Sequence, residues 1–163
     1  MKNILLLGLI CILFSCQPKV DDHSKELQNQ IDKLKSELSE TYKPGFGEFM
    51  GNIQVHHSKL WFAGKNENWE LADFEINEIK EALEDIEKYQ SERTESKSIP
   101  MINPALDSVS NAIQQKNLIQ FERSYKLLTN TCTSCHQATN HEFIQIAIPS
   151  QQNFSNQRFK LEN

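Results

Sequence analysis

The feature that most constrains the fold is a set of apolar stripes that recur every three or four residues from residue 46 to residue 128. This spacing places side chains on one face of an α-helix, whereas a strand would need apolar residues at every second position. The chain contains only five Gly and five Pro, fewer turn-forming residues than a β-rich architecture needs. We therefore expect an all-α protein, an antiparallel four-helix bundle with a partly irregular C-terminal tail.

Turn and capping residues mark the ends of these helices. The first helix of the bundle is predicted over about 46–63, with Gly64 as its C-terminal stop. The second begins at Asn66 or Asn68, whose side chains can accept a hydrogen bond from the first turn. It is expected to fray in the polar run 91–98. The remaining boundaries are expected at Pro100, Pro104 and Asn117.

The N-terminus has the pattern of an export signal. An unbroken apolar run of eleven residues, Ile4–Phe14, follows a short charged start and ends just before Cys16. The run is too short to span a bilayer, but it fits the apolar region of a signal peptide. The sequence Leu13-Phe14-Ser15-Cys16 resembles a bacterial lipobox, which predicts a signal peptide over 1–15 and lipid on Cys16; an ordinary signal peptide is the alternative. Because no Asp follows directly at 17–19, an outer-membrane address on the periplasmic side of the cell envelope is favoured by analogy.

Residues 16–43 are expected to form a lipidated tether that becomes an amphipathic helix, followed by the bundle and a C-terminal extension over 44–163. A polar helix that holds the domain off the membrane is favoured, and a zipper that joins a homodimer is the alternative. The seam residues are Leu27, Ile31, Leu34, Leu38 and Tyr42.

Cysteine usage points to a covalent cofactor. Of the four cysteines, Cys11 leaves with the signal and Cys16 is used by lipid, so only Cys132 and Cys135 remain in an oxidising compartment. Thiols at i and i+3 share one helix face and can reach the two vinyl groups of a haem, and His136 can then bind the iron. C-x-x-C-H is the attachment signature of c-type haem, so we expect one covalent haem c.

The motif also allows three other interpretations. A redox dithiol needs a nearby βαβ pattern, and none is visible. A zinc site could use Cys132, Cys135, His136 and His141, but adjacent residues point poorly at one tetrahedral ion. A disulfide between Cys132 and Cys135 closes only a small loop and stabilises little; it would make the chain a non-haem helical lipoprotein that serves as an interaction module.

An exported helical domain with this motif on its last helix resembles the class II cytochromes c, the cytochrome c-prime family. The resemblance covers about residues 44–141 and rests on the motif, on Phe49-Met50-Gly51 in the first helix and on Phe121 before the motif. It implies a four-helix bundle with haem near one end. The family usually has a Tyr-Arg pair shortly after the histidine, where this chain has Gln137 to Asn140, and often an Arg where Phe46 stands.

The sixth iron ligand decides the function. Met50 is the candidate and His57, seven residues later on the same stripe, is the alternative; His56 lies about 100° round the helix and is expected nearer solvent. A filled sixth position predicts single-electron transfer to an unidentified redox partner, and an open one predicts binding of NO or CO.

No arrangement of carboxylates or of Ser and His suggests an enzyme, although an open haem could support weak peroxidase activity. A net charge of −5 argues against nucleic-acid binding.

Overall fold

The computed structural model describes residues 22–41 and 44–162. The predicted signal peptide, 1–15, and the predicted lipid site, Cys16, lie outside this part of the chain. The described residues form helices and irregular segments with no strand, which confirms the expected all-α class. The helices are α2 (Asp22–Thr41), α3 (Phe46–Lys65), α4 (Trp69–Tyr89), the 3₁₀ helix η2 (Glu95–Ile102), α5 (Asn103–Gln114) and α6 (Leu118–Ala138).

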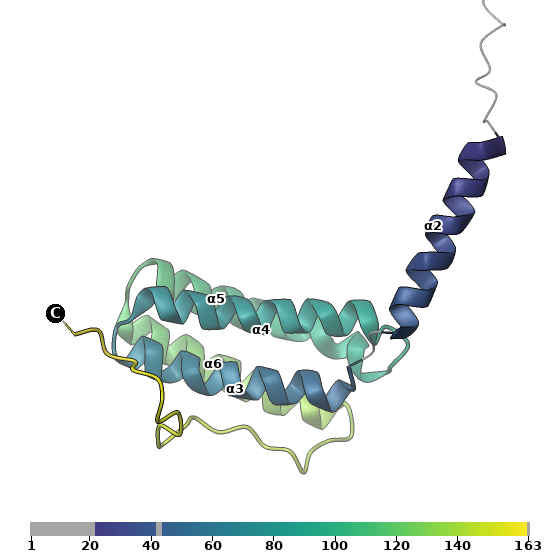
Figure 1. Ribbon diagram of the computed structural model, residues 1–163. Coiled ribbons are helices and arrows are strands. Elements are labelled where there is room, and N and C mark those ends of the chain that lie inside the picture. The colour runs from purple at the N-terminus through teal and green to yellow at the C-terminus, as the bar shows by residue number, and fades with distance from the viewer. Residues whose placement is uncertain (1–21, 42–43, 163) are drawn as a thin grey trace, which may run out of the picture. The chain divides into compact units, whose positions relative to one another are not determined.

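The chain divides into two compact units, residues 1–42 and residues 43–163. The second unit is an antiparallel bundle in which α3 packs on α4, α4 on α5 and α5 on α6 (Figure 1). The ring closes between α6 and α3, and this helix pair has the least extensive contact of the four. Aliphatic and aromatic side chains from all four helices meet in one buried core, which burial of apolar surface stabilises.

Helices α3, α5 and α6 end in the same way, with one residue in the left-handed region. These residues are Glu67, Lys116 and Asn140, with φ of 56°, 51° and 60°. In each case the following amide bonds back into the last turn, the Schellman arrangement that satisfies the free carbonyls of a helix end. Asn68 and Asn117 then cap α4 and α6, accepting hydrogen bonds from the amides of Leu71 and Gln120.

The prediction that Gly64 ends its helix is wrong. Gly64 lies inside α3, and a Cβ there would fall 2.1–2.6 Å from three ring carbons of Phe121. The glycine is therefore required by close packing of α6 against α3, while the helix continues to Lys65.

The polar run 91–98 is also more ordered than expected. Its second half lies in η2, where Ser96 is buried and donates a hydrogen bond of 2.6 Å to the carbonyl of Gln90. The Gln90 side chain donates in turn to the carbonyl of Pro44 at 2.8 Å. These bonds hold η2 across one end of the bundle, and α5 follows directly with Pro104 in its first turn.

After α6 the chain turns back and runs without regular secondary structure along the bundle (Figure 1). We call residues 141–161 the C-terminal strap. Its far part is fixed by Phe159, which is 4% exposed and lies with its ring centroid 5.7 Å from that of Phe62 in α3. The Asn68 side chain donates a hydrogen bond of 3.1 Å to the carbonyl of Phe159.

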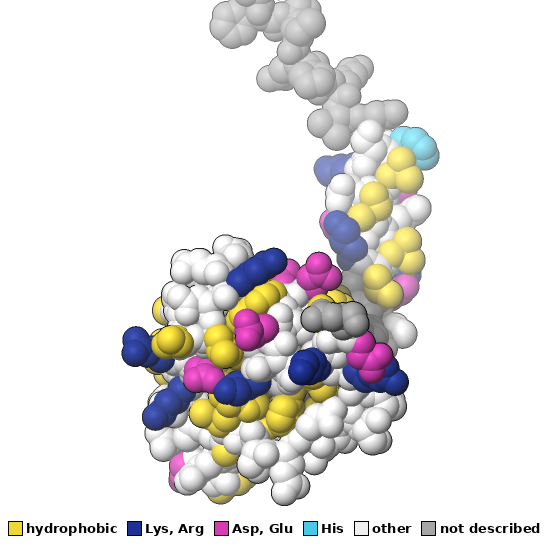
Figure 2. Space-filling model, turned by 90° about the vertical axis from the view of Figure 1, so that its left-hand side faces the viewer, with side chains coloured by type: hydrophobic (Ala, Val, Ile, Leu, Met, Phe, Trp, Pro, Cys, Tyr) yellow, Lys and Arg dark blue, Asp and Glu magenta, His cyan; other side chains and the backbone are white. Residues whose placement is uncertain are grey.

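In the first unit, α2 carries an apolar stripe that remains exposed, and part of it is visible in Figure 2. Leu27, Ile31, Leu34 and Leu38 are each between 43% and 68% exposed. The homodimer zipper remains a prediction. None of the helices in the described part of the chain is both long and apolar enough to span a membrane.

Candidate functional site

A cavity of about 480 Å³ lies at the end of the bundle where η2 crosses it. Its walls come from α3, α6, η2 and the strap, with one residue from α4. All five bundle residues that the sequence singled out line it: Met50, His57, Cys132, Cys135 and His136. The volume falls in the range of roughly 300–1,000 Å³ that is usual for cofactor and ligand sites.

The cavity is lined on two sides by α3 and α6, the neighbouring helices with the least extensive contact in the bundle. The apolar part of its wall includes Ile53, Leu83, Ile99 and Ile102, all of them buried core residues. The bundle therefore presents an apolar space with a few polar groups converging on it, the composition expected of a cofactor site.

The two thiols lie one helical turn apart on α6. Neither is in a disulfide, and the Cys135 thiol makes only a long contact of 3.9 Å to the carbonyl of Ser98. Burial raises the pKa of Cys132 to about 12 and also raises the pKa of Cys135. Both thiols are therefore protonated at neutral pH, unlike the low-pKa thiolate that a redox dithiol uses.

His136 has the geometry of an imidazole prepared to bind a metal. Its Nδ1–H donates a hydrogen bond of 2.9 Å to the carbonyl of Ile144 in the strap. With the proton on Nδ1, the lone pair is on Nε2, which has no hydrogen-bond partner among the described residues. A second hydrogen bond at Nδ1 is the usual way in which proteins orient a histidine that binds metal through Nε2.

His57 also lines the cavity, but both of its ring nitrogens are engaged. The Thr129 hydroxyl donates to the carbonyl of Tyr125 at 2.9 Å, so its oxygen is free to accept from His57 Nε2–H at 3.0 Å. His57 Nδ1 then accepts a hydrogen bond of 3.0 Å from the Tyr125 hydroxyl. The same hydroxyl also donates to the backbone carbonyl of His57 at 2.8 Å. Burial lowers the pKa of His57 to about 4, so the ring is neutral at physiological pH.

Met50 differs from His57 in its environment. It is half-buried, packs against the core and lines the cavity from α3. Its thioether makes no hydrogen bond to another described residue, so coordination would break none. Of the two sequence candidates, Met50 is therefore the one whose donor atom is free.

Two charged residues in the cavity wall were not anticipated from the sequence. Arg93 donates a hydrogen bond of 2.8 Å to Glu95, and its guanidinium carbon lies 5.0 Å from the centroid of the Phe46 ring. The hydrogen bond from Arg93 lowers the pKa of Glu95. The only signal in the sequence was a single Arg in a polar run, and this run reaches the cavity because η2 folds across the bundle end.

His56 is more exposed than His57, as expected, although its side chain is still only 12% exposed and is paired with a carboxylate of α4. Its Nδ1 lies 2.6 Å from a carboxylate oxygen of Glu75, a residue that is 1% exposed, and Glu78 lies 3.8 Å from Nε2. This pair joins α3 to α4 outside the cavity wall. His141 does line the cavity, but no group of three or more His, Cys, Asp or Glu side chains in the described residues is arranged to hold a metal ion by itself.

Searches for similar proteins returned nothing for this chain: no family model, no curated protein and no solved structure matches it.

Proposed function

We propose that this chain is an exported, lipid-anchored c-type cytochrome that carries one covalent haem and transfers single electrons. The observation that supports this most is that Cys132, Cys135, His136 and Met50 all line one apolar cavity. The spacing of the first three fits covalent haem, and the fourth is the soft ligand that raises a haem reduction potential.

The residues present fit such a haem. Cys132 and Cys135 would hold it through thioether bonds, and His136 would bind its iron through Nε2. When bound, the haem supplies a one-electron redox centre. The chain contributes apolar walls that exclude water and a fixed imidazole, which together set the potential and limit side reactions.

The hydrogen bonds of His57 favour Met50 as the sixth ligand. Coordination by His57 would have to break its bond to Thr129 or the one to Tyr125 and leave a buried hydroxyl without its partner. Coordination by Met50 breaks no bond. We infer that His57 braces α3 against α6 beside the cavity.

The test is to express the domain with haem-maturation machinery and to record oxidised and reduced spectra with and without CO. The proposal predicts a low-spin spectrum that CO leaves unchanged in the wild type and that becomes high-spin and CO-sensitive in Met50→Ala. His57→Gln should keep the low-spin spectrum. Met101→Ala is the matched control, because Met101 is 42% exposed and lies outside the cavity wall. A low-spin spectrum that is lost in His57→Gln and kept in Met50→Ala would contradict this assignment.

Binding of NO or CO is the second candidate function, and one observation favours it. Gly47 and Gly51 line the cavity from α3 on either side of Met50, and a Cβ at either position would meet no atom within 4 Å. This side of the cavity therefore has room for a diatomic molecule. A high-spin wild-type spectrum that shifts with CO would support gas binding and replace electron transfer.

The location is also a proposal, based on the sequence alone. Lipid on Cys16 would anchor the chain to the periplasmic side of the cell envelope, with the outer membrane favoured. Mass spectrometry of the N-terminal peptide should find an acylated Cys16, and Cys16→Ser should release the protein from washed membranes. An unmodified Cys16, or a Cys16→Ser variant that stays membrane-bound, would contradict the anchor.

A further inference from the structure

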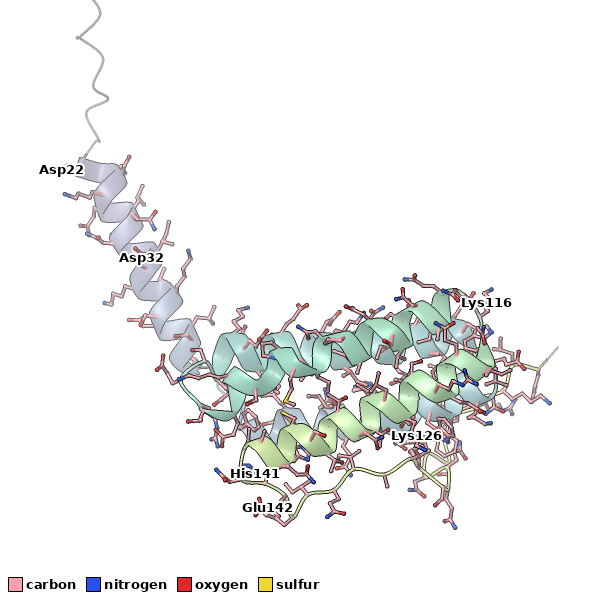
Figure 3. All side chains as sticks on the ribbon, turned by 180° about the vertical axis from the view of Figure 1, so that it is seen from behind. Asp22, Asp32, Lys116, Lys126, His141 and Glu142 are labelled. Carbon is pink, nitrogen blue, oxygen red and sulfur yellow. The ribbon has the colours of Figure 1, made fainter. Side chains whose placement is uncertain are left out.

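The C-terminal strap has no role in the proposal above beyond its wall residues, and the sequence alone did not explain it. Asn140, in the left-handed conformation, reverses the chain at the end of α6, and the amide of His141 bonds back to the carbonyl of His136 at 2.7 Å. His141 and Glu142, labelled in Figure 3, mark the place where the chain leaves the helix and starts back. The amide of Ile144 then bonds to the carbonyl of His141 at 2.9 Å, which closes a tight turn.

This turn brings the strap back beside the haem motif. The Ile144 carbonyl accepts the hydrogen bond from His136 Nδ1–H, and Ile144 and Ile146 both contribute to the cavity wall. The Ile144 side chain is 41% exposed, so the residue contacts the site chiefly through its backbone.

Thr133, one turn before His136 on α6, fixes the register of the strap. Its Oγ1 accepts a hydrogen bond of 3.0 Å from the amide of Ile146 and lies 3.4 Å from the carbonyl of the same residue. One threonine thus holds the backbone two residues beyond the carbonyl that His136 uses. The motif is C-T-S-C-H, and its first variable residue is the one that makes this contact.

The other end of the strap is anchored independently. Phe154 and Phe159 lie with their ring centroids 6.4 Å apart, and the ammonium of Lys59 in α3 lies 5.3 Å from the Phe154 centroid. With the bond from Asn68 to the Phe159 carbonyl, the strap is held to α3 and α4 at one end and to α6 at the other. The Ile144 carbonyl lies between the tight turn after α6 and the bond from Ile146 to Thr133, so the backbone is held on both sides of it.

We propose that the strap is a positioning element for the iron ligand: it holds the His136 ring through the Ile144 carbonyl and makes Nε2 the better electron donor. This rests on the proposed haem site. A carbonyl bonded to Nδ1–H fixes the tautomer and ring orientation and raises the basicity of the ligating nitrogen. A more basic imidazole stabilises oxidised iron, so the intact strap lowers the reduction potential.

The test compares Thr133→Val with Thr131→Val in the full chain. Both threonines lie on α6 and bond to the carbonyl four residues earlier, but only Thr133 also contacts the strap. Two quantities are measured: hydrogen exchange of the amides of residues 142–148, and the reduction potential. In Thr133→Val we expect exchange of the Ile146 amide to accelerate by tenfold or more and the potential to rise. Thr131→Val should resemble the wild type in both.

Unchanged exchange in Thr133→Val would show that Thr133 does not hold the strap and would overturn the proposal. Faster exchange with an unchanged or lower potential would overturn the positioning role, because the strap would then only shield the site from water. If the intact mass shows that the expressed chain carries no covalent haem, the proposed function is contradicted. Hydrogen exchange of the amides of residues 142–148 still shows separately whether the strap is docked.

Discussion

The two ends of this bundle are built from the same helices but fill their interiors in opposite ways. At the end with the α3–α4 and α5–α6 connections, the chain fills the space with its own rings. Trp61 lies 4.8 Å from Tyr125 between ring centroids, and Trp69 lies 6.1 Å from Phe121. Gly64 leaves just enough room for Phe121, and the interior is closed.

At the end with the C-x-x-C-H motif, the side chains do not fill the space, and the cavity of about 480 Å³ remains. The groups that converge there are thiols, an imidazole, a thioether and a guanidinium, in place of further aromatic rings. Protein interiors are close-packed, and a large apolar space is costly unless it serves a ligand. The closed end therefore contributes close packing to the fold, whereas the open end leaves a cavity of the size usual for a ligand.

The largest effect should come from removing the imidazole at the open end. His136→Ala should abolish the low-spin spectrum of the haem-loaded protein, because His136 is the histidine that directly follows Cys135 in the attachment motif. His141→Ala is the control: His141 also lines the cavity and its Nδ1–H donates to the carbonyl of Thr139 at 2.7 Å, as His136 does to Ile144, but it lies outside the motif. Optical and electron paramagnetic resonance spectra compare the two. Loss of the low-spin signal in His141→Ala alone would reverse this assignment.

The second effect concerns His57, between the two ends. Its pKa falls from 6.5 in the unfolded chain to about 4 in the fold, so between these values the unfolded state binds more protons. The free energy of unfolding should therefore drop by about 3 kcal/mol as the pH falls from 6.5 to 4 and change no further from this group below 4. Urea titrations across this range check it, with His57→Gln as the variant that cannot titrate. Equal pH dependence in both proteins would show that His57 is not held neutral.

The third effect tests the closed end. Gly64→Ala should lower the free energy of unfolding by about 2 kcal/mol, because a Cβ would overlap the Phe121 ring, which is fully buried. Gly51→Ala in the same helix is the control, since a Cβ there meets nothing within 4 Å and should stabilise the helix by about 0.5–1 kcal/mol. Chemical denaturation measures both. If the two variants unfold alike, the packing at the closed end is not as tight as described.

The smallest effect compares two helix caps. Asn68 and Asn117 both cap a helix with a side-chain oxygen, but Asn68 also donates to the strap at the Phe159 carbonyl. In each Asn→Ala variant, loss of the cap should lower the free energy of unfolding by about 1 kcal/mol. In Asn68→Ala, loss of the buried hydrogen bond to the strap should lower it by about 1 kcal/mol more. Thermal unfolding would show the difference, and equal losses would mean that the far end of the strap is not anchored through Asn68.

The sequence was sufficient to predict the helices of the bundle and five of the residues that line the cavity. Apolar periodicity is a local property, so the helix positions and the all-α class followed from it. The motif Cys132-x-x-Cys135-His136 is also local, and Met50 and His57 were placed by their position on one stripe. The structure brings all five to one cavity.

What the sequence could not show depends on contacts between distant segments. Gly64 has the pattern of a helix stop, and only the position of Phe121 reveals it as a packing residue. Arg93 and Ile144 have no sequence signature, because each reaches the site through an irregular segment whose path is set by tertiary hydrogen bonds. The pairing of His56 was missed for a similar reason: its partner Glu75 comes from the neighbouring helix.

The most direct test of the central claim is the intact mass of the wild-type protein after expression with haem-maturation machinery. The account predicts one haem per chain, retained after denaturation, and none in the double variant Cys132→Ser, Cys135→Ser. A wild-type mass without haem, in cells that load a control cytochrome c fully, would contradict it. A mass lower by two hydrogens would identify a Cys132–Cys135 disulfide and make the chain a helical lipoprotein of another kind.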